Sequence, residues 1–396
     1  MPTAATLEVA DIFRSYGDRF REQHAGRLPL EHLRAMSAIE HCRTAELGGH
    51  VYECDHCRER RVAYNSCRNR HCPKCQGAER LRWLEARQRE LLPVDYFHVV
   101  FTLPAELGPL ALRNPKPLYS LLFRCAAQTL LEVATSPKRL GARLGVLAVL
   151  HTWGQQLTHH PHVHCIVPGG GLSPTGDRWI PSRRGYLLPV RVLSRVFRGK
   201  YLAGLQAARA AGELAWVGKV EHLADPETFQ SFLDALYNQE WVVYCKPPFA
   251  GPERVLKYLS RYTHRVALSN QRLLRMESDT VVLTYKDYRH GGRWRLLRLR
   301  AEELIRRFLQ HVLPSGFVRI RYYGLLANRH RAEALRLCRE ALGASPPEGV
   351  PVEEASPPSW ACPHCGEGNL RIVGRVSRRE APAALLRERA PPCRAA

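Results

Sequence analysis

Periodic runs of apolar residues divide the chain into predicted helices and strands. Apolar positions at helical spacing predict helices over four stretches, residues 8–24, 30–40, 79–92 and 116–135. Runs rich in β-branched and aromatic residues predict strands over residues 94–104, 146–151, 163–167 and 241–245, with a hairpin formed by 266–269 and 280–285. Residues 146–151 are expected to pair antiparallel with the strand at 163–167.

Two histidines flank the first valine of the predicted strand at 163–167. Successive side chains on a strand point to opposite faces, so His162 and His164 share a face while Val163 packs behind them. Gly169 to Gly171 ends the strand. Two neutral imidazoles that converge on one point suit a divalent metal. The alternative interpretation is a histidine-rich loop beside Pro161.

About a hundred residues further on, a predicted helix carries two tyrosines. Pro252 suits the first helical position and Glu253 the first turn. Tyr258 and Tyr262 are four residues apart, which places both phenols on one helix face. Taken alone, such a pair more often consists of half-buried packing residues.

Together these motifs resemble the HUH endonucleases, whose paired histidines hold a metal and whose helix-borne tyrosine attacks a DNA phosphate. The tyrosine pair resembles the two-tyrosine branch, and Phe101-Thr102-Leu103-Pro104 resembles its first motif. Within that branch, the chain from about His41 to Arg371 looks like a rolling-circle insertion-sequence transposase of the insertion-sequence-ninety-one type. The resemblance implies an α+β fold: a ferredoxin-like HUH domain with a central antiparallel sheet, preceded by a small zinc-binding module.

The resemblance also implies a mechanism. Tyr258 and Tyr262 would be the catalytic nucleophiles, leaving a 5′-phosphotyrosine and a free 3′-OH. A metal held by His162 and His164, Mg²⁺ or Mn²⁺, would polarise the scissile phosphate. We expect Gln156 as the third ligand with His151 as its alternative. Gln155 and His264 are weaker candidates.

Thirteen cysteines in a chain without a recognisable signal pattern indicate metal ligands rather than disulfides. Cys54, Cys57, Cys72 and Cys75 form two Cys-x-x-Cys motifs whose spacing predicts one structural, four-thiolate Zn²⁺ site. Three further residues could build a second site or replace one of these ligands: Cys42, Cys67 and His71. Near the end of the chain, Cys362 and Cys365 form half a site, for which spacing provides no convincing partner.

A formal charge of +22 predicts a nucleic-acid partner. Between residues 286 and 331 basic side chains alternate with aromatic ones, a pattern suited to single strands because every base can stack on an aromatic ring. The alternative is that the aromatic residues belong to the core. The predicted DNA-binding residues are Arg68, Arg70, Arg261, Arg265, Arg289, Arg293, Trp294, Arg295, Arg319 and Arg321.

We therefore expect four regions: an N-terminal helical segment (1–40), the zinc-binding module (41–92), the nuclease domain (93–345), and a linker with a partly disordered tail (346–396). No apolar run reaches the roughly 18 residues of a membrane span, and we expect a cytoplasmic protein without membrane partners. The expected partner is single-stranded DNA at transposon ends and targets, with host replication factors as further candidates. The alternative functions are a rolling-circle replication initiator and a non-catalytic, zinc-dependent DNA-binding protein.

Overall fold

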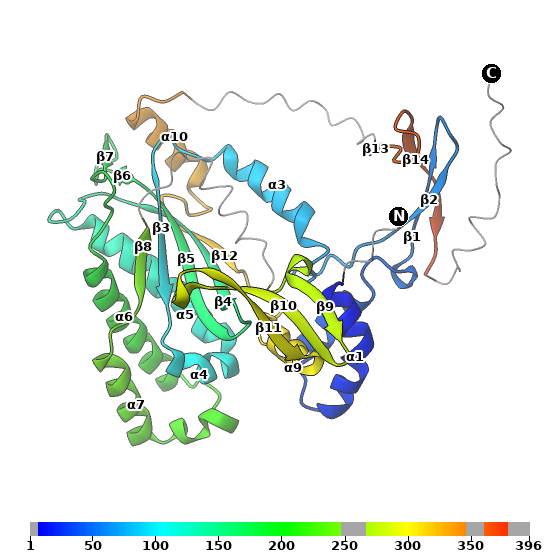
Figure 1. The fold of residues 1–396 in the computed structure, drawn as a ribbon. Coiled ribbons are helices and arrows are strands. Elements are labelled where there is room, and N and C mark those ends of the chain that lie inside the picture. Colours follow the sequence, from blue (N-terminus) through cyan, green and yellow to red (C-terminus); the bar gives the residue numbers. More distant parts are fainter. Residues whose placement is uncertain (1–6, 247–266, 346–359, 379–396) are drawn as a thin grey trace.

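The centre of the molecule is a five-stranded antiparallel sheet in the order β12-β4-β5-β3-β8 (Figure 1). The computed structural model describes residues 7–246, 267–345 and 360–378. The strands of the central sheet are β3 (Tyr96–Thr102), β4 (Gly145–Trp153), β5 (His159–Pro168), β8 (Val243–Lys246) and β12 (Ile320–Gly324). The predicted antiparallel pairing of the histidine strand with its upstream neighbour is confirmed as β4 with β5.

Strand alternation gives this sheet two different faces. Odd-numbered residues of β3 and β5, such as Phe97 and Val163, belong to the main hydrophobic core. Helices cover this face and contribute their apolar sides to the same core: α4 (Gly108–Arg113), α5 (Pro115–Thr135), α6 (Val190–Ala210) and α7 (Pro226–Asn238). Even-numbered residues of the same strands point to the opposite face, where Tyr96 and Ile166 pack against Trp83 of α3 (Gln76–Gln88). The histidines therefore lie on the face away from the helical layer.

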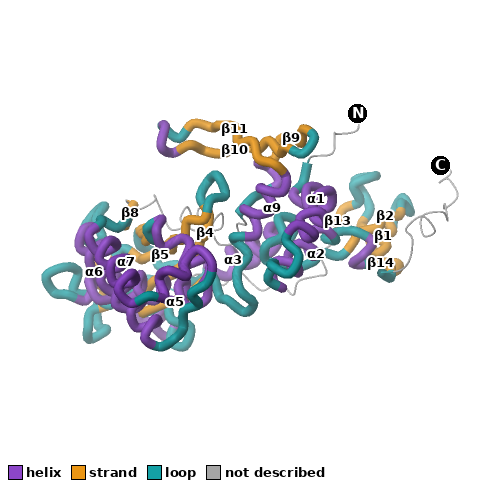
Figure 2. Tube along the Cα trace, turned by 90° about the horizontal axis from the view of Figure 1, so that it is seen from below, coloured by secondary structure: helices purple, strands orange, loops and turns teal. Residues whose placement is uncertain are grey.

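A second core joins the N-terminal helices to a later hairpin. It contains α1 (Val9–Gln23), α2 (Leu30–Glu40), α9 (Ala301–Leu309) and the sheet of β9 (Leu273–Glu277), β10 (Thr280–Asp287) and β11 (Arg293–Arg300). Phe13 of α1 packs edge-on against Phe308 of α9 at 5.3 Å between ring centroids. Figure 2 shows the β10–β11 ribbon extending away from α9.

A four-stranded sheet forms the cysteine-rich end of the molecule. Its strands, in the order β13-β14-β1-β2, are β13 (Trp360–Ala361), β14 (Asn369–Val376), β1 (Gly49–Cys54) and β2 (Arg60–Tyr64). The C-terminal strand thus lies beside a strand from the first sixth of the chain (Figure 1). The region 346–396 is expected to be partly disordered, yet within it β14 continues to Val376 because its backbone pairs with β1. The other elements are β6 (Gly170–Leu172), β7 (Trp179–Pro181) and α10 (Arg331–Ala341).

Most predicted elements are confirmed, and so is the α+β class with a central antiparallel sheet and a preceding cysteine-rich module. The expected hairpin partner of 280–285 is wrong. Residues 267–269 form no strand, and β10 instead pairs with β9 and β11. A turn at Asn270–Arg272, where Arg272 donates a hydrogen bond to the carbonyl of Thr284, precedes β9, so this strand begins only at Leu273. In the described part of the chain, no helix is long and apolar enough to cross a membrane.

Candidate functional site

Three histidines meet on the open face of the central sheet. His151 of β4 pairs directly with His162 of β5, and His164 lies two residues further along the same face. One ring nitrogen from each lies within 4.8 Å of the other two. The sheet register thus brings together three potential metal ligands from two strands.

Hydrogen bonds select the nitrogen that each imidazole of β5 can offer. The Nδ1–H of His162 donates to the carbonyl of His160 at 2.6 Å, so its Nε2 carries the lone pair. Nδ1 of His164 shares a 2.7 Å hydrogen bond with Nε2 of His98 on β3. Since a nitrogen in that bond cannot also ligate, a metal at this point would be bound through Nε2 of His164.

Burial keeps these imidazoles neutral. Desolvation lowers the pKa of His162 to about 4, that of His98 to about 4, and that of His164 well below its ordinary value. A neutral imidazole has the lone pair that a metal requires. The donor set and its spacing therefore fit a divalent cation.

A cavity of about 510 Å³ opens over the histidines. Its walls come from β4, β5, β8 and the β10 hairpin, and three basic side chains face it: Lys246, Arg272 and Lys286. Among the described residues, no carboxylate lines this cavity. Its lining residues are His151, Trp153, Gly154, Gln155, His160, His162, His164, Lys246, Arg272, Lys286 and Tyr288. A metal-binding floor under cationic walls suits a phosphate.

The prediction of Gln156 as third ligand does not agree with this geometry. Gln156 is exposed and does not line the cavity, whereas His151 is buried within the cluster. The tight turn at the end of β4 explains the difference. Leu157 adopts a left-handed conformation with φ of 60°, and the carbonyl of Gln156 accepts a hydrogen bond from Arg307. The alternative ligand, His151, is the one that the sheet positions.

The predicted nucleophiles Tyr258 and Tyr262 lie outside the described residues, as do Arg261, His264 and Arg265. Lys246, the last described residue before them in the chain, lines the histidine cavity.

Eight of the twelve described cysteines form two groups of four, and neither group is the predicted set. Cys42, Cys67, Cys72 and Cys75 form one group, and Cys54, Cys57, Cys362 and Cys365 form the other. The two predicted Cys-x-x-Cys motifs are separated because one belongs to the β1–β2 hairpin while the other packs at the end of α2. His71 joins neither group. Its Nε2 accepts from the backbone of Leu313, and burial lowers its pKa to about 3.

The predicted DNA-binding residues divide into exposed and inward-facing sets. Arg68, Arg293, Trp294 and Arg295 are exposed, with Trp294 at 66%. The prediction does not fit Arg70. Its guanidinium donates hydrogen bonds to the backbone carbonyls of Leu313, Pro314 and Phe317. Arg321 is half-buried and stacks on Phe123 and Phe317, and Arg319 is also half-buried. The side chain of Arg289 is outside the description.

Sequence reasoning missed His98, Lys246, Arg272 and Lys286. His98 is an even-numbered residue of β3, so side-chain alternation places it on the same sheet face as His162 and His164. Only the pairing of β3 with β5 reveals its contact with His164. The three basic residues come from separate elements, and no local spacing links them.

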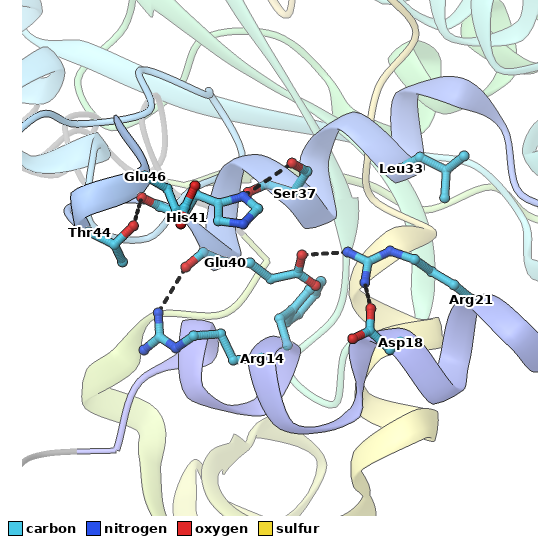
Figure 3. A pocket seen from close by; sticks show the side chains of 10 residues that line it. Arg14, Asp18, Arg21, Leu33, Ser37, Glu40, His41, Thr44 and Glu46 are labelled. Atoms are coloured by element: carbon cyan, nitrogen blue, oxygen red, sulfur yellow. Dashed lines mark hydrogen bonds and ion pairs between the residues drawn. The ribbon is translucent and has the colours of Figure 1, made fainter. Parts of the chain in front are cut away.

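A second pocket, between α1 and α2, is lined by polar side chains that pair with groups on both helices (Figure 3). Arg14 donates to the carbonyl of Glu40 at 2.9 Å, and Arg21 bridges the carboxylates of Asp18 and Glu40. Thr44 donates to the carbonyl of His41. These hydrogen bonds and ion pairs stabilise the packing of α1 against α2, which gives the polar residues of this pocket a structural role.

Two sequence profiles match the chain, one described as "Putative transposase" over residues 145–334 and one as "Transposase zinc-binding domain" over residues 12–103. The first spans the histidine cluster, and the second spans the first cysteine group and half of the second. These matches identify a transposase with an N-terminal zinc-binding domain, and the chain belongs to the IS91-type family of Y2 transposases.

Relatives within this family are similar over most of their length. The chain is 51% identical to "Putative transposase y4qJ" of Sinorhizobium fredii (strain NBRC 101917 / NGR234), over 92% of this chain and 94% of that protein. It is 29% identical to the "Transposase for insertion sequence element IS801" of Pseudomonas savastanoi pv. phaseolicola, over 78% and 74%. Among solved structures, the conjugative relaxase TrwC in complex with OriT DNA is similar to this protein. The match covers 63% of this chain and 72% of the TrwC chain. Its identity is 14% and its TM-score 0.25, a likeness that adds nothing to the family assignment.

Proposed function

We propose that this transposase nicks and rejoins single-stranded DNA by tyrosine attack, through a 5′-phosphotyrosine intermediate, in rolling-circle transposition. One observation carries the proposal: the cluster of His151, His162 and His164 lies under a cationic cavity bordered by Lys246. The chain continues from Lys246 into the segment that contains Tyr258 and Tyr262.

Three imidazoles fill only three coordination positions of such an ion, so other positions stay available for substrate oxygens. Mg²⁺ or Mn²⁺ would be held by His151, His162 and His164, and nitrogen ligands favour Mn²⁺ in vitro. When bound, the ion would polarise the scissile phosphate and stabilise the charge that develops on its oxygens.

The side chains of this protein would bind and cut the strand. Lys246 and Lys286 would hold the phosphate by charge, and Arg272 would add to the positive potential. A tyrosine phenol, with an ordinary pKa near 10, would lose its proton as its oxygen bonds to phosphorus. The bond to the 3′ oxygen would break, and that oxygen would leave as a hydroxyl after taking up a proton. Attack by the released 3′-OH on the phosphotyrosine would reverse these bond changes.

Two tyrosines four residues apart, which the sequence predicts to share a helix face, would let the enzyme hold one 5′ end while cutting a second strand. Tyr258 and Tyr262 would alternate between donor and target DNA. The energy of each broken phosphodiester would be kept in the phosphotyrosine bond. No nucleotide hydrolysis is then required for rejoining.

The β10–β11 hairpin offers a path for the strand beside the cavity. Lys286 and Tyr288 border the cavity, and the ammonium of Lys286 lies 5.4 Å from the ring centroid of Tyr288. Trp294 pairs with Lys286 across the hairpin and is exposed, flanked by Arg293 and Arg295. Exposed aromatic rings between basic side chains suit stacking of unpaired bases.

Cleavage of labelled single-stranded oligonucleotides tests this proposal. We expect Mn²⁺-dependent cleavage that is abolished by His162→Ala and by the Tyr258→Phe/Tyr262→Phe double variant, while each single tyrosine variant retains cleavage. Gln156→Ala serves as the matched control, because Gln156 lies beside the site without lining it. DNA binding without cleavage under any of these conditions would instead support a zinc-dependent DNA-binding protein.

A further inference from the structure

The second cysteine group joins residues about 300 positions apart. Cys54 and Cys57 lie at the turn after β1, whereas Cys362 and Cys365 lie in the turn between β13 and β14. The Sγ atoms of Cys54 and Cys365 are 3.8 Å apart, and those of Cys57 and Cys362 are also 3.8 Å apart. Four thiolates around zinc at about 2.3 Å give sulfur–sulfur distances of about 3.8 Å, far longer than the roughly 2.05 Å of a disulfide.

Both turns present backbone N–H groups to sulfur. The N–H of Cys57 donates to Sγ of Cys54 at 3.5 Å, and that of Gly368 donates to Sγ of Cys365 at 3.4 Å. Hydrogen bonds of this kind stabilise a thiolate, which is the form of cysteine that a metal binds. Cys54 and Cys362 are almost completely buried. The two turns are thus built alike and face each other.

Gly368 leaves room for this arrangement. A Cβ at this position would lie 2.5 Å from Sγ of Cys54 and 2.6 Å from Cβ of His56. Since real Cβ atoms do not approach so closely, only glycine lets the C-terminal turn sit against the N-terminal one.

The surrounding contacts continue the same junction. β14 pairs with β1 from Gly49, opposite Val376, to Cys54, opposite Leu370. The carboxylate of Asp55 accepts from the backbone of Asn369 at 2.7 Å and pairs with Arg371 at 3.2 Å. The C-terminal segment is therefore an integral part of the N-terminal sheet.

We propose that Cys54, Cys57, Cys362 and Cys365 bind a second structural Zn²⁺ that clasps the C-terminal segment onto the N-terminal module. This site is separate from the group of Cys42, Cys67, Cys72 and Cys75. The matched zinc-binding domain ends at residue 103, so it contains Cys54 and Cys57 but not the other two ligands of this second site. The N-terminal module is consequently complete only after residues 360–378 have been synthesised.

The clasp also completes a basic surface. A pocket of about 490 Å³ is lined by Arg68 and Asn65 from the N-terminal module and by Arg378 from the end of the C-terminal segment. Attachment of the C-terminal segment therefore places Arg378 in the lining of the same pocket as Arg68.

Zinc counting on the full-length protein tests the proposal. A His162→Ala/His164→Ala background removes the cavity site from the count. We expect two zinc ions per chain in this background, one in Cys54→Ser/Cys57→Ser, and one in Cys362→Ser/Cys365→Ser. Combining all four substitutions should still leave one. A zinc content unchanged by Cys362→Ser/Cys365→Ser, or loss of both ions from that variant, would overturn the proposal.

A second measurement follows the clasp without relying on cysteine variants. Gly368→Ala should lose one of the two zinc ions, because its Cβ would displace Cys54, whereas Gly374→Ala should keep both. Gly374 is the matched control, since a Cβ there would meet its nearest neighbour, Val51, at an ordinary 3.7 Å. After cleavage at a protease site inserted between residues 346 and 359, the C-terminal fragment should co-elute with the protein in zinc and dissociate with chelator. Co-elution that is insensitive to chelator would contradict a zinc clasp.

Discussion

His98 is predicted to set the metal affinity of the site without touching the metal. Its Nε2 lies 2.7 Å from Nδ1 of His164, and both side chains are buried, so this hydrogen bond fixes the ring orientation and tautomer of His164. Replacing His98 with phenylalanine would keep the volume of the ring but leave the buried Nδ1–H of His164 without this partner.

The magnitude follows from that geometry. A buried donor deprived of its acceptor costs about 1–3 kcal/mol. Loss of a partner that orients a metal-bound histidine typically weakens metal binding by about 10–100-fold. We therefore expect His98→Phe to raise the Kd for Mn²⁺ by about 10–100-fold, with a smaller loss in His98→Gln, whose side-chain oxygen can still accept.

Calorimetric titration of Mn²⁺ into the full-length protein measures this effect. His160→Gln is the matched control. His160 lines the same cavity, and only its backbone carbonyl, which the substitution retains, receives the hydrogen bond of His162. A Kd in His98→Phe equal to that of His160→Gln would refute the role assigned to His98.

Three further predictions concern the third histidine of the metal site, the β10–β11 hairpin and the buried His311. His151→Ala should weaken Mn²⁺ binding more than His98→Phe does, whereas Gln156→Ala should leave it unchanged in the same titration; the reverse order would restore Gln156 as the third ligand. Trp294→Ala should weaken single-stranded DNA binding by about 1–3 kcal/mol in fluorescence anisotropy, with little change for duplex DNA, while Leu296→Ala on the same hairpin face should have a small effect; equal losses for both DNA forms would argue against stacking. Burial lowers the pKa of His311 to about 4 from an ordinary 6.5, so the unfolded chain binds the proton first and stability falls as pH drops from 6.5 towards 4, by up to about 3 kcal/mol. Denaturant unfolding should show a shallower acid dependence in His311→Gln, and an unchanged dependence would show that His311 does not carry this effect.

Local patterns in the sequence predict the part of the site that depends only on the alternation of side chains along one strand. The alternation around Val163 is sufficient to place His162 and His164 on one face and to turn that face away from the helical core. The same pattern cannot identify His151 as the third member, because its place opposite His162 depends on the register between β4 and β5.

Long-range contacts explain the failures. Cys-x-x-Cys spacing identifies metal-binding turns, but it does not say which turns combine, and Cys54 and Cys57 meet partners from the far end of the chain. Likewise, the charge of Arg70 predicts a phosphate contact, while the fold uses its guanidinium to bind the carbonyls around Leu313. In both cases tertiary packing, rather than local composition, determines the role.

The most direct test of the central claim identifies the residue that becomes linked to DNA. The protein would be incubated with Mn²⁺ and single-stranded DNA, denatured, digested with protease and nuclease, and analysed by mass spectrometry. We predict a nucleotide joined through its 5′-phosphate to the peptide containing Tyr258 and Tyr262, present with Mn²⁺ and absent with EDTA or in His162→Ala. A covalent link at another residue, or cleavage of DNA without any link, would contradict the two-tyrosine mechanism.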